Sequence, residues 1–252
     1  MTDEIIICPA GDIPPTNEPP KPNSTNPFHT MPPGIESPYA NYYADIKWGN
    51  GFEKWPLVRF ETRGDGSCLF HAIANSFFKP YHTEILYDKK VSRNKMISSF
   101  RKELSERLSD KISDDPTSPT HYEVVNRGYT AQWASEAKVE EYTLSYMQNQ
   151  LNSSSYIGYG YIEFIGNALN KDIYILEALR RDIYRQSDED LELTIKGNRN
   201  SIILYYMDNG HYELVGVKND DGTFGTHFSP DHTLIQFLYN RVQQIISSVR
   251  NS

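Results

Sequence analysis

The chain has 252 residues, of which 38% are hydrophobic and 23% are charged, a composition typical of a folded domain. Its formal net charge of −8 argues against a general nucleic-acid-binding protein, which carries a basic balance. No segment approaches the roughly 20 apolar residues of a membrane helix, and the N-terminus lacks the basic start and long apolar stretch of a signal peptide. We therefore expect a soluble intracellular protein, cytoplasmic or nuclear, that partners neither nucleic acid nor membrane.

The first 40 residues differ from the rest of the chain in composition. Ten of the 15 prolines fall there, and proline both lacks a backbone N–H and fixes φ, so neither a helix nor a sheet ladder is expected. We predict an extended or disordered tail over residues 1–40 and one folded domain over residues 41–252. The two cysteines, Cys8 and Cys68, fall in different parts, which argues against a disulfide framework and fits a reducing compartment.

The order of helices and strands in the domain follows from the spacing of its apolar residues. In chain order, these patterns predict a strand at 57–60, helices at 68–77, 91–110, 132–151 and 162–169, strands at 172–176, 201–206 and 212–217, and a helix at 232–249. An Asp-Asn-Gly turn at 208–210 joins the last two strands as a hairpin. Helices that come first and paired strands that come late predict an α+β or α/β fold, with helices around a small mixed central sheet.

The most informative stretch is Gly64-Asp65-Gly66-Ser67-Cys68, at the start of the predicted helix 68–77. Unpaired N–H groups and the positive end of the helix dipole favour a thiolate at this position. The glycines allow the loop to turn its N–H groups toward one point, where they can hold an oxyanion. Cys68 is therefore a candidate nucleophile, and a buried structural cysteine is the alternative, because free cysteine is among the most buried residue types.

A thiol nucleophile needs a base, and one of the seven histidines stands out. His211 opens the strand after the Asn-Gly turn, and His211 and Glu213 point to the same side because side chains alternate along a strand. A carboxylate beside an imidazole fixes its tautomer and stabilises the imidazolium. An exposed hairpin with an incidental His/Glu pair fits this spacing equally well. His71 is interpreted as an ordinary helix position.

Metal and cofactor sites are not expected. Cys68 and His71 have the spacing of two zinc ligands, but the folded part has no second cysteine and no second clustered pair. The glycines at 158 and 160 lack the Lys-Ser/Thr of a phosphate-binding loop, and a tight turn before the next helix explains them better.

Three blocks of the sequence resemble, in the same order, motifs of the ovarian tumour (OTU) family of cysteine proteases. Residues 64–74 are similar to the family's nucleophile motif, Asp-Gly-x-Cys-Leu-Phe/Tyr-x-Ala. Residues 158–163, with 168–169 and 173–175, are similar to its Gly-x-x-Glu helix and the strand that follows. Residues 210–213, Gly-His-Tyr-Glu, are similar to its terminal His-Tyr-Asp/Asn motif. The resemblance spans about residues 57–217.

The resemblance implies a papain-like α/β fold and hydrolysis of isopeptide bonds after the C-terminus of ubiquitin or polyubiquitin. It matches Cys68 to the nucleophile, His211 to the general base and Asp65 to the motif aspartate, which either takes part in the chemistry or shapes the loop. At position 213 the family has Asp or Asn and this chain has Glu, so either Glu213 or Asp65 is expected to orient His211. Two alternatives are an OTU-like module that binds ubiquitin without turnover and a deconjugase of another ubiquitin-like modifier.

Overall fold

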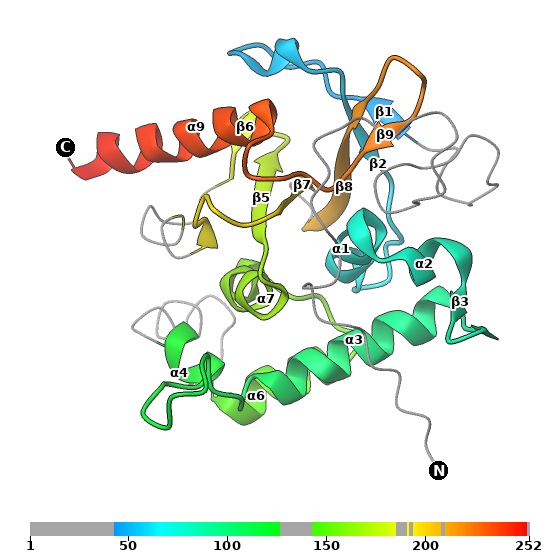
Figure 1. Cartoon of the computed structure of the whole chain (residues 1–252), viewed down its shortest axis with the longest axis vertical. Coiled ribbons are helices and arrows are strands. Elements are labelled where there is room, and N and C mark those ends of the chain that lie inside the picture. Colours follow the sequence, from blue (N-terminus) through cyan, green and yellow to red (C-terminus); the bar gives the residue numbers. More distant parts are fainter. Residues whose placement is uncertain (1–42, 127–142, 185–190, 192–193, 208–209, 251–252) are drawn as a thin grey trace.

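The computed structural model describes residues 43–126, 143–184, 191, 194–207 and 210–250 (Figure 1). The predicted tail with Cys8, residues 132–142 of the third predicted helix and two residues of the 208–210 turn lie outside this part. The boundary between tail and domain that we expect at residues 40 and 41 therefore stays a prediction. Within the described part, no helix is both long enough and apolar enough to cross a membrane.

A mixed seven-stranded sheet forms the centre of the protein. The sheet order is β1 (Tyr43–Asp45), β2 (Leu57–Phe60), β8 (His211–Lys218), β7 (Ser201–Met207), β5 (Asp172–Glu177) and β6 (Asp182–Ile183), with β9 (Phe224–Gly225) paired to β8. The neighbours β5 and β7 are parallel and the other pairs are antiparallel. A two-stranded hairpin of β3 (Ile85–Leu86) and β4 (Lys89–Lys90) stands apart.

The pairing of β2 with β8 brings the loop before Cys68 close to His211, the first residue of β8. Phe60, at the end of β2, lies opposite Leu214, near the start of β8. Because the strands are antiparallel, the loop that leaves β2 toward Cys68 starts at the same edge of the sheet as His211. Residues that are about 140 positions apart in the sequence are thereby brought to one place.

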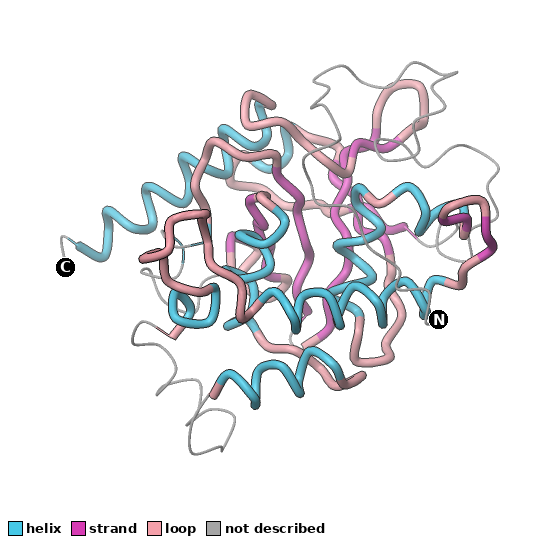
Figure 2. Tube along the Cα trace, turned by 60° about the horizontal axis from the view of Figure 1, so that its bottom comes forward, coloured by secondary structure: helices cyan, strands magenta, loops and turns pink. Residues whose placement is uncertain are grey.

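Helices cover both faces of the sheet (Figures 1 and 2). The helical segments are η2 (Phe52–Lys54), α1 (Cys68–Phe77), α2 (Lys79–Thr83), α3 (Arg93–Arg107), α4 (His121–Val125), α6 (Leu144–Asn152), η3 (Tyr159–Tyr161), α7 (Ile162–Leu169) and α9 (Thr233–Arg250). The core on one face joins the sheet to α1, α3, α6 and α7, and the core on the other face joins it to α9.

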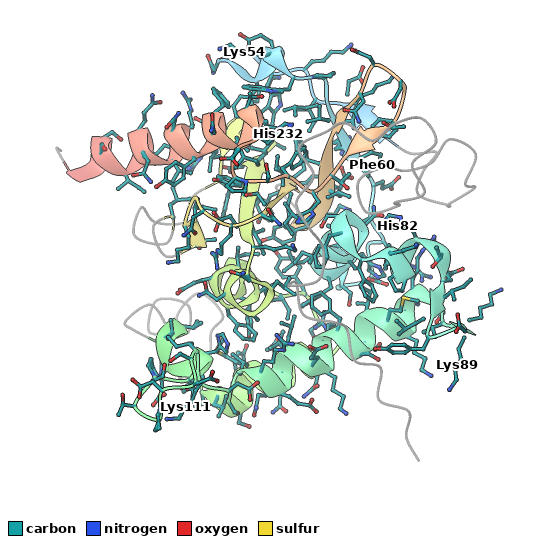
Figure 3. All side chains as sticks on the ribbon, viewed as in Figure 1. Lys54, Phe60, His82, Lys89, Lys111 and His232 are labelled. Carbon is teal, nitrogen blue, oxygen red and sulfur yellow. The ribbon has the colours of Figure 1, made fainter. Side chains whose placement is uncertain are left out.

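Alternation along the central strands explains the two cores. In β5 and β7, Ile173, Ile175, Ile202 and Leu204 belong to the core with α1, whereas Tyr174, Leu176 and Ile203 belong to the core with α9. Side chains with a period of two point to opposite faces, so a strand that is apolar throughout needs a cover on each side. Phe60 is fully buried, whereas exposed Lys89 and Lys111 project from the outside of the protein (Figure 3).

The structure confirms the predicted α+β class and most of its long elements. The strand 57–60 and the helices 68–77 and 162–169 have the predicted bounds, and β5, β7, β8 and α9 differ from prediction by one or two residues. Helix α3 begins at Arg93, later than predicted, because the Ser92 hydroxyl caps it by accepting a hydrogen bond from the Lys95 N–H. The sequence did not predict the short strands β1, β3, β4, β6 and β9, which are two or three residues long. Their pairing partners define them more than their own pattern does.

Candidate active site

Cys68 is the first residue of α1, and it is buried, with 3% of its surface exposed. Burial raises the pKa of the Cys68 thiol, while backbone hydrogen bonds from Tyr212 and Leu69 to the sulfur act to lower it. The helix start therefore favours the thiolate, as the sequence predicts, but desolvation outweighs it. A thiol with a raised pKa needs a base to remove its proton before the sulfur can attack as a nucleophile.

His211 is the first residue of β8, next to the backbone that contacts the sulfur. Thr62 connects the two segments, because its Oγ1 lies 3.4 Å from His211 Nε2 and its hydroxyl donates to the carbonyl of Tyr212. About a fifth of the His211 side chain is exposed, at 18%. The loop before Cys68 and the start of β8 are thus held together, as the β2–β8 pairing requires.

Glu213 lies on the same side of β8 as His211, as strand alternation predicts. Its Oε1 is 3.9 Å from His211 Nε2, which is an ion-pair distance and longer than a hydrogen bond. Its Oε2 accepts a hydrogen bond of 2.8 Å from Arg59 Nη1. The carboxylate is buried, with 5% of the side chain exposed, and Arg59 balances its charge. The extra methylene of Glu therefore does not carry the carboxylate away from the imidazole.

Arg59 is a residue of this cluster that the sequence analysis did not identify. It lies in β2, in the sequence Leu-Val-Arg-Phe, between buried apolar residues. A charged residue in a strand that is otherwise apolar is the pattern that could have identified Arg59 from the sequence. Its guanidinium carbon lies 5.4 Å from the centre of the Tyr205 ring, and Tyr205 is the cross-strand partner of Glu213. Arg59 thus fixes the Glu213 carboxylate from the neighbouring strand.

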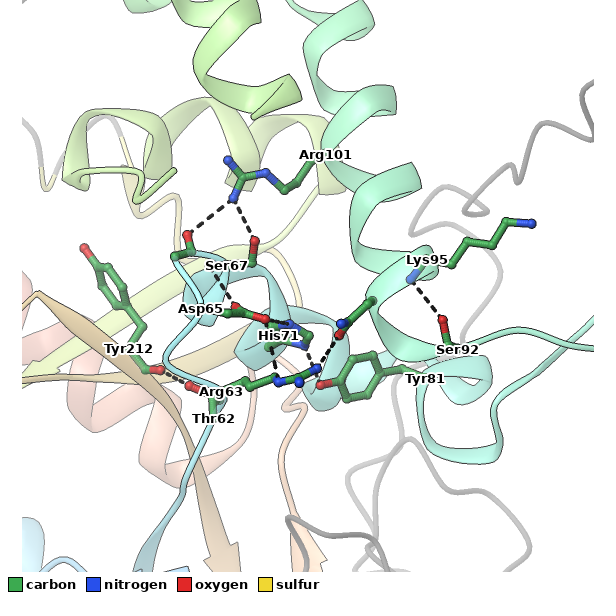
Figure 4. A network of polar contacts seen from close by, with 12 residues as sticks. Thr62, Arg63, Asp65, Ser67, His71, Tyr81, Ser92, Lys95, Arg101 and Tyr212 are labelled. Carbon is green, nitrogen blue, oxygen red and sulfur yellow. Dashed lines mark hydrogen bonds and ion pairs between the residues drawn. The ribbon is translucent and has the colours of Figure 1, made fainter. Parts of the chain in front are cut away.

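Asp65 makes its polar contacts within α1 and the loop of residues 61–67 before Cys68, which we call the nucleophile loop (Figure 4). Its Oδ1 accepts a hydrogen bond of 3.1 Å from the Ser67 N–H, two residues later, in the manner of an Asx turn. Its Oδ2 lies 3.4 Å from His71 Nε2 and 3.9 Å from Arg63 Nε. The Asp65 carboxylate therefore lies where it shapes the loop before Cys68. Glu213 is the carboxylate that lies near His211.

His71 is more than an ordinary helix position. It is almost fully buried, and its Nδ1 lies 2.8 Å from the Tyr81 hydroxyl while its Nε2 faces Asp65. Burial lowers the pKa of His71, and the charge of Asp65 acts in the opposite direction. His71 thus anchors Asp65 to α1. This role depends on α2, which places the Tyr81 hydroxyl beside the other ring nitrogen of His71.

The segment after α6 packs against the loop before Cys68 and the turn before His211. Gly66 has a φ of 79°, and a Cβ there would overlap the carbonyl oxygen of Ser154. Two residues later, the Tyr156 ring lies 3.3 Å from where a Cβ of Gly210 would be, and it stacks on Tyr212 with centroids 6.3 Å apart. The segment thereby closes the space between the loop before Cys68 and the turn before His211.

Residues 63–212, more than half of the chain, match the family model of the OTU-like cysteine protease. This chain belongs to that family. The match starts in the nucleophile loop and ends one residue after His211, so it covers the region whose two ends the fold brings together. The resemblance to the OTU family and the OTU-like α+β fold, both expected from the sequence, are confirmed.

Solved structures of OTU domains are similar to this chain at low identity. The structure of an OTU domain in complex with ubiquitin has 20% identity and a TM-score of 0.44, and the match covers 83% of this chain and 94% of that one. The OTUD1 OTU domain has 17% identity and a TM-score of 0.38, covering 63% and 85%. The OTU protease of Farallon virus has 12% identity and a TM-score of 0.36, covering 70% and 98%. No curated protein matches the chain in sequence.

Membership of the OTU family makes the protein a cysteine protease by class. The roles of Cys68, His211, Glu213 and Asp65 follow from motif and geometry, and they stay predictions for this chain.

Proposed function

We propose that this protein is a deubiquitinating cysteine protease, which hydrolyses isopeptide bonds after the C-terminal glycine of ubiquitin. The observation that carries the proposal is the contact between the Cys68 sulfur and the backbone of Tyr212, the neighbour of His211. The helix that starts with Cys68 and the strand that starts with His211 begin at the same end of the central strands. Membership of the OTU family supports the choice of ubiquitin as the substrate.

The raised pKa of the buried Cys68 thiol sets the first step of the mechanism. His211 accepts the Cys68 proton as the sulfur attacks the glycine carbonyl, because burial keeps the pKa of the thiol high. Backbone N–H groups of residues 65–68 hold the oxyanion, except that of Ser67, which donates to Asp65. When the intermediate collapses, the C–N bond breaks and His211 gives its proton to the leaving lysine amine. A thioester between ubiquitin and Cys68 remains.

Water completes the cycle. His211 takes a proton from a water molecule, which attacks the thioester carbonyl and releases the ubiquitin carboxylate and the Cys68 thiol. In both halves Glu213 stabilises the imidazolium of His211, and Arg59 holds the Glu213 carboxylate at 2.8 Å. Asp65 shapes the loop in this mechanism through its bonds to Ser67 and His71.

The chain offers a matched pair of cysteine variants for the test. Cys68→Ala is expected to abolish cleavage of diubiquitin, whereas Cys8→Ser, in the predicted tail, is expected to cleave at the wild-type rate. Wild-type cleavage by Cys68→Ala would overturn the assignment of the nucleophile.

An electrophilic probe built on the ubiquitin C-terminus separates the alternatives. The wild-type protein is expected to form a covalent adduct at Cys68, located by peptide mass spectrometry. A module that binds ubiquitin without turnover would form no adduct and cleave no chain. A deconjugase of another modifier would react with a probe carrying that modifier and leave the ubiquitin probe untouched.

A further inference from the structure

Arg101, on α3, holds the nucleophile loop from the side opposite to Asp65 (Figure 4). The side chain is buried, and the residue is only 3% exposed. Its guanidinium donates hydrogen bonds to the Gly66 carbonyl at 3.4 Å, the Ser67 Oγ at 3.1 Å, the Leu151 carbonyl at 2.9 Å, the Gln150 carbonyl at 2.8 Å and the Ser155 carbonyl at 3.0 Å. One side chain therefore joins α3, the end of α6 and the loop before Cys68.

The five acceptors are neutral oxygens, which is a costly way to bury a cation. Burial lowers the pKa of Arg101 to about 10, so the guanidinium is still charged at neutral pH. The Phe70 ring, on α1, lies 4.5 Å from its central carbon and adds a cation–π contact. Arginine suits this place because its rigid planar fork reaches several acceptors at once, whereas lysine has a single ammonium.

The bond to Gly66 fixes the orientation of the peptide plane between Gly66 and Ser67. In a trans peptide the C=O and N–H point in opposite directions. The Gly66 carbonyl points to Arg101, and the Ser67 N–H donates to Asp65 Oδ1 at 3.1 Å. This plane is therefore held from both sides, and it directly precedes the N–H of Cys68.

We propose that Arg101 is a positioning residue for the reaction, which keeps the nucleophile loop in the conformation that turns its N–H groups toward the oxyanion. The inference rests on the proposed function, and Arg101 acts through the loop without touching the substrate. Because the same guanidinium binds the carbonyls at 150, 151 and 155, the loop keeps its shape only while the end of α6 stays in place.

The matched control lies on the same helix. Arg107 also donates to a backbone carbonyl, that of Ala168 at 3.0 Å, and it pairs with Glu103 at 2.6 Å. We compare Arg101→Lys with Arg107→Lys at a temperature where thermal unfolding shows both to be folded. Arg101→Lys is expected to lower kcat on diubiquitin about tenfold and to leave KM within twofold, since the loop and not the substrate surface is changed. Arg107→Lys is expected to keep the wild-type kcat.

Ser67→Ala provides a milder change at the other end of the same contact. The Ser67 hydroxyl makes no capping bond to α1, and it accepts from Arg101 at 3.1 Å. This variant leaves every carbonyl acceptor of Arg101 satisfied, so it folds even if Arg101→Lys does not. A fall in kcat of about two- to fivefold is expected, as for the loss of one modest hydrogen bond.

Hydrogen exchange of residues 64–69 gives a readout that needs no substrate. Faster exchange there in Arg101→Lys than in Arg107→Lys supports the proposal. Equal kcat and equal exchange in the two lysine variants would overturn it. If the wild-type protein forms no adduct with the ubiquitin probe, the proposed function fails, and the exchange comparison still decides whether Arg101 holds the loop.

Discussion

Gly66 is the position in the nucleophile loop that tolerates a side chain least. Its φ of 79° lies in the left-handed region, where alanine costs about 1 kcal/mol. A Cβ would also overlap the Ser154 carbonyl oxygen, a backbone atom that cannot rotate away, and relieving such an overlap costs about 1–3 kcal/mol. We therefore expect Gly66→Ala to lower the free energy of unfolding by about 2–4 kcal/mol, which corresponds to about 5–15 °C in Tm for a domain of this size.

Gly64→Ala is the matched control in the same loop. No heavy atom lies within 4 Å of a Cβ at Gly64, and its φ is outside the left-handed region, so its stability is expected to stay within about 0.5 kcal/mol of wild type. Thermal unfolding and diubiquitin cleavage are measured for both variants. A shift of the loop by about 1 Å reduces kcat by up to about 100-fold, so Gly66→Ala is expected to lose activity as well. Equal Tm and equal kcat in the two variants would refute this account of the loop.

Two further predictions concern buried charges. Glu213→Gln removes the carboxylate that lies 3.9 Å from His211 and pairs with Arg59. We expect kcat to fall about 10- to 100-fold in Glu213→Gln, and we expect Glu213→Asp to retain part of the wild-type kcat. An unchanged kcat for Glu213→Gln would show that another group orients His211. Lys171 is buried against His227, 2.8 Å away, and burial lowers the pKa of Lys171 from 10.5 to about 8. Between pH 8 and pH 10.5 the unfolded chain keeps the Lys171 proton while the folded chain has lost it. Lys171 therefore makes the free energy of unfolding rise with pH across this window, by about 3 kcal/mol. Lys171→Met should lack that rise, and urea unfolding at pH 7.5 and pH 10 tests it: parallel changes in the variant and the wild type would contradict the prediction.

The sequence determined the parts of the site that are local in the chain. The glycines around Asp65, the cysteine at a helix start and the alternation of His211 with Glu213 each depend on a few consecutive residues, whose backbone geometry their own side chains favour. The apolar periodicity of the long elements is local in the same sense, and it predicted α1, α7 and β2 with their observed bounds. These motifs were sufficient to identify the family.

Only the tertiary structure decided how the motifs are held and charged. Arg59 meets Glu213 across 154 positions of sequence, and Arg101 meets Gly66 across 35. The pKa of the Cys68 thiol is raised because the assembled core removes it from water, although the helix start by itself favours the thiolate. The physical reason is common to these cases: solvation and long-range pairing depend on which elements pack together, and no local pattern in the chain carries that information.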